Sequence, residues 1–130
     1  MGKTTKRFEE LEIWRLARRF AKEVWLLTLR PAFSKDFELK NQINKSAGSS
    51  MDNIAEGHDR GGNKEFIHFL TIARASNSEA RSQLIRAYDR RHIEKEKFEE
   101  LYHLNIEVGV KTTRLISSLS SKGYKGSKFK

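Results

Sequence analysis

Apolar residues recur at helical spacing along four stretches of the chain. At about 100° per residue they form one-sided arcs, the pattern of amphipathic helices packed around a core. The stretches cover approximately residues 9–29, 37–56, 64–91 and 94–121. Pro31 ends the first stretch, and a very short connection near His92 makes the last two helices antiparallel neighbours. We therefore predict an all-α fold: an antiparallel up-down-up-down four-helix bundle over residues 9–121.

Cap-forming residues mark where the predicted helices begin and end. Ser34 is the candidate N-cap of the second helix, with Asp36 favourable in its first turn. Gly57 is placed as the left-handed residue that ends this helix. Asn63 is the candidate N-cap of the third helix, after a glycine pair that is interpreted as a turn between helices.

The core patterns of three helices carry further information. The apolar arc of the first helix covers about half of its circumference, wider than one core requires, which predicts a second contact surface. The stripe of the third helix includes Asn77, and the seam of the fourth includes Asn105 and Thr112. Polar residues at such positions fix the register of packed helices, and we interpret Asn105 and Thr112 in this way.

Charge separates the chain into basic and near-neutral parts. Its 26 Lys and Arg against 17 Asp and Glu give a net charge of +9, which attracts nucleic acid or other anionic surfaces. Residues 1–8 are predicted to be a disordered basic N-terminus, and residues 122–130 a flexible basic tail. The most regular basic feature is a face of the first helix at i, i+3, i+4 and i+7: Arg15, Arg18, Arg19 and Lys22.

This basic face is the strongest functional signal in the sequence. It has no acid on its centre line, although Glu12 and Glu23 flank it. A solvated face that keeps the protein soluble is one interpretation. The other is that the face binds the phosphate backbone of nucleic acid. No aromatic residue is interleaved on the face, so no base-stacking platform is expected there. Further candidate nucleic-acid contacts are Arg74 and Arg81 on the third helix, and Lys122 and Lys125 in the tail.

Other function classes find little support. Without cysteine there are no disulfides or thiol chemistry, and no apolar run approaches the ~20 residues of a membrane span. No secretory signal is present, so the expected location is the cytoplasm. No nucleophile elbow, phosphate-binding glycine loop or His-Glu-x-x-His motif occurs, and we expect neither an enzyme nor a cofactor. His58 and His92 are interpreted as surface residues.

A di-metal carboxylate bundle is a remote alternative. Two Glu-x-x-His pairs occur, Glu65 with His68 and Glu100 with His103, as in di-iron four-helix bundles. In those bundles the ligands project into the core. Here both pairs lie off the apolar seams of their helices. The number of candidate ligands therefore matches the di-iron bundles, but their side chains do not point into the core.

Polar residues gather where the second predicted helix ends. Asn53, Glu56 and Arg60 surround Gly57, and Glu79 follows on the third helix. Glu56 lies in a last helical turn, where the helix dipole disfavours negative charge, so it should need a cation, and Arg60 is the nearest. We interpret Asn53, Glu56, Gly57, Arg60 and Glu79 as a structural corner that specifies packing, within the chain or against a neighbouring subunit.

The same region carries a family resemblance. The run Asn53-Ile54-Ala55-Glu56-Gly57 is followed by Arg60, Glu65-Phe66, Phe69-Leu70, Ile72-Ala73 and Ser76-x-x-Glu79. Earlier matches are Phe8-Glu9-Glu10-Leu11 with Trp14 and Ala17, and Leu39-x-x-Gln42-Ile43. Together these residues resemble the four-helix bundle proteins encoded by intervening sequences in bacterial 23S rRNA genes, also called S23 ribosomal proteins.

The resemblance implies a homo-oligomer, with a homopentameric ring favoured. It also implies similarity in architecture to the accessory variability determinant of diversity-generating retroelements, a basic pentameric barrel that binds a reverse transcriptase and nucleic acid. The leading hypothesis is therefore a non-enzymatic homo-oligomeric bundle that binds nucleic acid, RNA above DNA, through basic helix faces. The alternative is a protein-interaction scaffold or accessory subunit of a retroelement reverse transcriptase. The partners implied are further copies of the chain, nucleic acid such as ribosomal RNA, and a reverse transcriptase.

Overall fold

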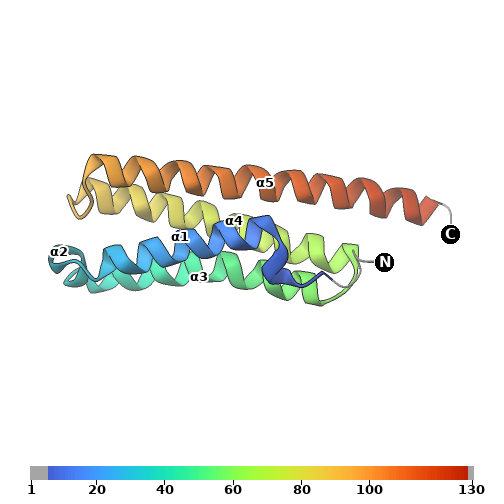
Figure 1. Cartoon of the computed structure of the whole chain (residues 1–130), viewed down its shortest axis with the longest axis horizontal. Coiled ribbons are helices and arrows are strands. Elements are labelled where there is room, and N and C mark those ends of the chain that lie inside the picture. Colours follow the sequence, from blue (N-terminus) through green and yellow to red (C-terminus); the bar gives the residue numbers. More distant parts are fainter. Residues whose placement is uncertain (1–5, 129–130) are drawn as a thin grey trace.

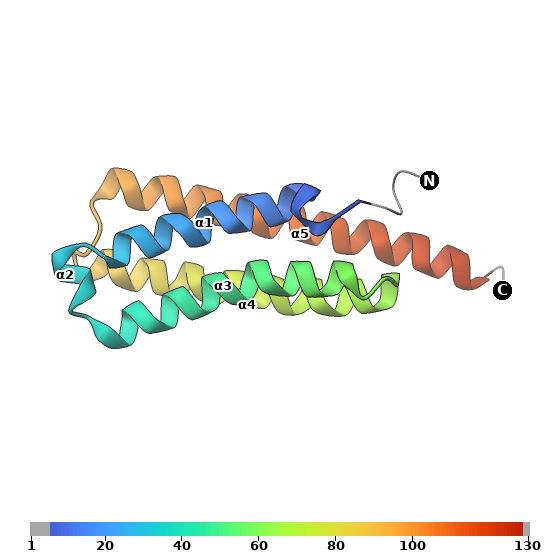
Figure 2. The same ribbon diagram turned by 60° about the horizontal axis from the view of Figure 1, so that its bottom comes forward.

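The computed structural model describes residues 6–128 of the 130-residue chain, and their side chains as far as Ser121. These residues form a short 3-10 helix and five α-helices, and no strand occurs among them. The elements are η2 (Phe8–Glu10), α1 (Glu12–Thr28), α2 (Pro31–Ser34), α3 (Phe37–Asp59), α4 (Asn63–Asp89) and α5 (Lys95–Lys128). The four long helices α1, α3, α4 and α5 run side by side in alternating directions, which confirms the predicted all-α bundle (Figures 1 and 2).

Each long helix packs against two others. α1 packs against α3 and α5, and α4 packs against the same two helices, so α1 and α4 occupy opposite corners of the bundle. The wide apolar arc of α1 is thereby divided between two neighbours within one chain. Trp25, which is 49% exposed, is the most exposed member of that arc. Most of its width is therefore used inside the bundle, and Trp25 at its edge remains open to solvent.

The core consists of two hydrophobic clusters separated by a polar layer. One cluster, at the α2 end, includes Phe20, Phe33, Leu39, Ile43, Leu84 and Leu101. The other, where α1 begins, includes Ile13, Ala17, Ile54, Leu70, Ala73 and Val108. Between them along their helices lie Ser50, Asn77 and Asn105, all buried.

The two asparagines of this layer pair symmetrically. The Nδ2 of Asn77 donates to the backbone oxygen and to the Oδ1 of Asn105 at 3.0 and 3.2 Å. The Nδ2 of Asn105 returns the same two bonds at 3.0 and 3.1 Å. Gly109 leaves room for the pair, since a Cβ there would lie 3.3 Å from the Nδ2 of Asn77. The predicted burial of Asn77, Asn105 and Thr112 is confirmed.

The connection between α1 and α3 differs from the prediction. Pro31 does not only end α1: it opens the one-turn helix α2, which inserts Phe33 into the core. Ser34 closes that turn, its hydroxyl donating to the oxygen of Pro31 at 3.0 Å, so it does not cap α3. Asp36 is the N-cap of α3, where its Oδ1 accepts a bond from the amide of Leu39 at 3.4 Å. A carboxylate is a strong N-cap because it also meets the positive end of the helix dipole.

The turn between α3 and α4 also corrects the sequence interpretation. Gly57 does not end α3, which continues to Asp59, and the left-handed residue is Gly61 with φ +89°. Gly57 is instead a buried packing position: a Cβ there would lie 2.6 Å from the Cβ of Phe69. The N-cap of α4 is Gly62, and Asn63 is the first helical residue. A glycine in this region serves close helix packing as well as turning, and only tertiary neighbours distinguish the two.

The bounds of the outer helices differ at both ends of the chain. Leu11, with extended backbone angles, separates η2 from α1, so the predicted single helix from residue 9 is interrupted. The helix α5 continues to Lys128, past the predicted boundary at residue 121. Of the segment predicted to be a disordered N-terminus, residues 1–5 lie outside the described residues. Residues 129–130 of the predicted tail also lie outside them.

Candidate nucleic-acid interface

Four cations form the outer surface of α1, and we call Arg15, Arg18, Arg19 and Lys22 the α1 ridge. All four side chains are exposed, and none lies within ion-pair distance of a carboxylate among the described residues. The Nε of Arg15 donates a hydrogen bond to the backbone oxygen of Glu9 at 2.8 Å. The guanidinium of Arg18 lies 5.6 Å from the ring centre of Trp14. The predicted face therefore forms one exposed, uncompensated row of positive charge.

The acids that flank the α1 ridge are held by lysines from α5. The Nζ of Lys111 lies 2.7 Å from the carboxylate of Glu12, and the Nζ of Lys97 lies 2.8 Å from that of Glu23. The bond from Lys97 lowers the pKa of Glu23 most, and the nearby charges of Arg19 and Lys22 add to this effect. The flanking acids are thus paired with lysines of α5, and neither forms an ion pair with a residue of the ridge.

An aromatic pocket adjoins one end of the α1 ridge. Phe8 packs edge-on against Trp14 with ring centres 5.2 Å apart, and Met51 of α3 completes the floor. The cavity measures about 660 Å³, and Arg15, Arg18 and Glu9 line its rim. The sequence interpretation found no aromatic side chain on this face and placed Phe8 in a disordered segment. The Trp14–Arg18 spacing of i, i+4 was the available signal, because such residues are neighbours on a helix surface.

The basic residues of α4 lie on a different face. Arg74 and Arg81 line an open groove between α4 and α5, and α4 occupies the bundle corner opposite α1. Their guanidinium groups have partners within the chain: Arg74 donates to the Oγ1 of Thr113 at 3.3 Å, and Arg81 to the Oδ1 of Asn105 at 3.2 Å. The structure therefore does not join them to the α1 ridge. The side chains of Lys122 and Lys125 lie outside the described residues.

The residues of the predicted corner make mostly local polar contacts. The Nε of Arg60 lies 3.0 Å from the Oε2 of Glu56, as predicted, but both side chains are half exposed. Arg60 also lies over the ring of Phe69, 5.0 Å from its centre. Asn53 donates to the backbone oxygen and the hydroxyl of Ser49, one turn earlier on α3.

Two short chains of hydrogen bonds continue from this corner to α4. The Ser49 hydroxyl lies 2.8 Å from that of Ser76 on α4, so Asn53 reaches α4 only indirectly. Glu79 accepts a long bond of 3.5 Å from Gln83 on its own helix. Gln83 in turn accepts from the hydroxyl of Ser46 on α3 at 2.5 Å.

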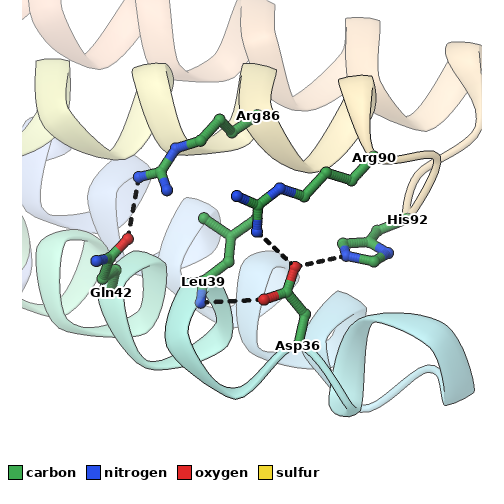
Figure 3. Close-up of polar contacts among 6 residues, drawn as sticks. All are labelled: Asp36, Leu39, Gln42, Arg86, Arg90 and His92. Carbon is green, nitrogen blue, oxygen red and sulfur yellow. Dashed lines mark hydrogen bonds and ion pairs between the residues drawn. The ribbon is translucent and has the colours of Figure 1, made fainter.

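A second polar cluster, which the sequence did not reveal, closes the opposite end of the bundle (Figure 3). The Oδ2 of Asp36 binds the Nη1 of Arg90 at 2.8 Å and the Nε2 of His92 at 2.9 Å. Hydrogen bonds from His92 and then Arg90 lower the pKa of Asp36 below its usual range. The His92 ring stacks on Phe33 with ring centres 4.8 Å apart, so His92 is not the surface residue predicted. The cluster fastens the start of α3 to the end of α4.

No arrangement for metal chemistry is found within residues 6–121, where no three His, Asp or Glu side chains are grouped to hold an ion. The residues of both Glu-x-x-His pairs are exposed on the outer surfaces of α4 and α5. No described helix is both long enough and apolar enough to cross a bilayer.

Comparison with known proteins identifies the family. Comparison with curated protein sequences gave no match. Among solved structures, the fold is similar to that of a protein of unknown function from the S23 ribosomal protein family of Bacteroides thetaiotaomicron. That structure has a TM-score of 0.73 and 21% sequence identity, and the match covers 80% of this chain and 97% of the other. The family model for 23S rRNA-intervening sequence proteins matches residues 9–114. This chain therefore belongs to the 23S rRNA-intervening sequence protein family.

Proposed function

We propose that this chain is a non-enzymatic, homo-oligomeric helical bundle that binds nucleic acid, RNA above DNA, through phosphate contacts at the α1 ridge. The observation that supports it is the charge pairing around α1. Four exposed cations stand in a row without acid partners among the described residues, while both flanking acids are paired with α5 lysines. A surface selected only for solubility has no need of this separation, because intermixed charges serve solubility equally well.

The expected binding is electrostatic and depends on salt. Each neutralised phosphate releases counterions, and log K falls with log salt by about 0.9 per contact on duplexes and about 0.7 on single strands. Four ridge contacts therefore contribute a slope of about 3 per chain. Single-chain affinity of this kind is weak, and several copies in one assembly raise it through effective concentration.

The test compares two variants of equal charge. In the first, all four ridge residues become Gln. In the second, four exposed lysines away from the ridge become Gln, namely Lys35, Lys45, Lys64 and Lys95. RNA binding is measured by fluorescence anisotropy from 50 to 300 mM salt. We expect the ridge variant to lose most of its affinity and about 3 units of salt slope, and the control to retain most of both. Equal losses in the two variants would show that only net charge matters and would refute the ridge.

Homo-oligomerisation is the second part of the proposal, with the pentamer implied by family resemblance. It is supported by large apolar side chains that one chain leaves exposed on α4 and α5, namely Ile72, Ile85 and Val110. Val110 lines the α4–α5 groove, and Ile85 lies in helical phase with Arg74 and Arg81 of the same groove. Light scattering coupled to size exclusion reports the mass directly. A mass near the 15.1 kDa of one chain would overturn both the ring and the argument from multiple copies.

A protein-interaction scaffold, such as an accessory subunit of a reverse transcriptase, is the second candidate function. The observation that favours it is an apolar group at the α2 end, where Leu26, Leu29 and Phe37 are 49%, 50% and 70% exposed. Exposed apolar patches of this kind commonly mark protein contacts. Replacing all three by Ser and measuring binding to a purified reverse transcriptase tests it; unchanged binding would remove this surface from consideration.

A further inference from the structure

We propose that the α1 ridge takes single-stranded nucleic acid, with bases stacked on Trp14 and Trp25. This inference rests on the proposed function and adds the substrate class. The two tryptophans are eleven residues apart, which places them within about 20° of each other around α1 and about 16.5 Å apart along its axis. Arg18 and Lys22 lie between them in sequence, beside the same edge of the helix.

The two tryptophans offer different contacts. Trp25 is 49% exposed, so much of its indole is open to solvent. Trp14 is half-buried at the aromatic pocket, against Phe8 and Met51. Arg18, 5.6 Å from the Trp14 ring centre, brings a guanidinium plane to the same place, and guanidinium planes also stack on bases. The pocket volume of about 660 Å³ is in the range of small-molecule sites.

The lining of the pocket indicates which part of a nucleotide enters it. Exposed Glu9 shares the rim with Arg15 and Arg18, so charge alone does not select there, whereas the rings of Phe8 and Trp14 suit the flat face of a base. The ridge cations Arg18, Arg19 and Lys22 continue along α1 toward Trp25 and suit the phosphates. Bases must be unstacked from their neighbours to reach indole rings, which a continuous duplex does not permit without deformation. Single strands, loops and bulges present bases in that state.

The experiment uses tryptophan fluorescence, because Trp14 and Trp25 are the only two tryptophans in the chain. Stacking of a base on an indole quenches its emission. The variants Trp25→Phe and Trp14→Phe each leave one reporter in the full-length protein, and both substitutions keep an aromatic ring. Each is titrated with a 15-nucleotide oligouridylate and with a 15-base-pair RNA duplex, and anisotropy of labelled RNA gives the affinity in parallel.

We expect the single strand to quench both reporters and the duplex to quench neither. Trp25→Leu should weaken single-strand affinity about tenfold, whereas Trp25→Phe should largely preserve it. Asn41→Ala, at an exposed position of α3, is the control and should change neither. Binding without quenching, or Trp25→Leu equal to the unmodified protein, would overturn the stacking inference and leave the proposed function standing. Absence of binding to both RNAs would overturn both.

Discussion

Replacing Asn105 by alanine tests whether the asparagine pair is a structural element of the bundle. The substitution removes four hydrogen bonds: three shared with Asn77 and one from Arg81. The Oδ1 of Asn77 would remain buried without a donor. An unsatisfied buried polar group costs about 1–3 kcal/mol, and the other lost bonds add to this, so we expect a destabilisation of about 3 kcal/mol.

The assay is urea unfolding followed by circular dichroism, at one fixed protein concentration because assembly would contribute to stability. In thermal unfolding followed by the same signal, the melting temperature should fall by about 10 °C. Asn41→Ala, at an exposed position of α3, is the matched control and should lie within about 0.5 kcal/mol of the unmodified protein.

A double-mutant cycle distinguishes pairing from simple loss of volume. If Asn77 and Asn105 act as a unit, Asn77→Ala costs about as much as Asn105→Ala, and the double variant costs little more than either. The coupling energy should then be about 2 kcal/mol. Additive effects of the two single substitutions would show that the amides do not depend on each other and would refute the reasoning.

Three further predictions concern the ends of the bundle. Gly57→Ala should destabilise by about 1–3 kcal/mol through overpacking, because its Cβ would lie 2.6 Å from that of Phe69; a melting temperature equal to that of the parent would contradict this. Glu56→Ala should lower the free energy of unfolding in urea by only about 0.5 kcal/mol, because its i, i+4 ion pair is half exposed; a loss above 2 kcal/mol would show that Glu56 is needed for packing. Asp36 has a lowered pKa in the folded state, so its ion pairs stabilise above the unfolded pKa of about 3.9, and that contribution is lost as pH falls through the lower folded pKa. Asp36→Asn, which keeps a good N-cap, should therefore be less stable than the parent at pH 7, with a gap that narrows toward pH 2; a constant gap would contradict this.

Long-range periodicity explains why much of the fold was predictable. The burial of Asn77, Asn105 and Thr112 followed from their phase in amphipathic helices, and phase accumulates over many residues. The ridge was exposed for the same reason: Arg15 and Lys22 lie opposite the apolar arc, whatever the neighbours of α1 are.

Helix ends and contacts between distant segments were less predictable. The same residue type, glycine, serves at Gly57 for close packing and at Gly61 for a left-handed turn, and local sequence does not separate the two uses. Asp36 and His92 are 56 residues apart, so neither residue's local pattern signals their contact. The aromatic pocket was missed because it depends on the chain turning at Leu11, which brings Phe8 onto Trp14.

Net charge alone would not have located the candidate interface, because the surface of this chain is organised by its ion pairs. The α5 lysines Lys97 and Lys111 join α5 to α1 through Glu23 and Glu12. These bridges do two things at once. They fasten adjacent helices, and they pair with α5 lysines the two acids best placed to offset the cations of α1. The field presented by the α1 ridge is therefore a property of the folded bundle: an isolated α1 peptide would have the same ridge with both acids free beside it. For that reason the ridge must be tested in the full chain, where helix packing determines which charges face outward uncompensated.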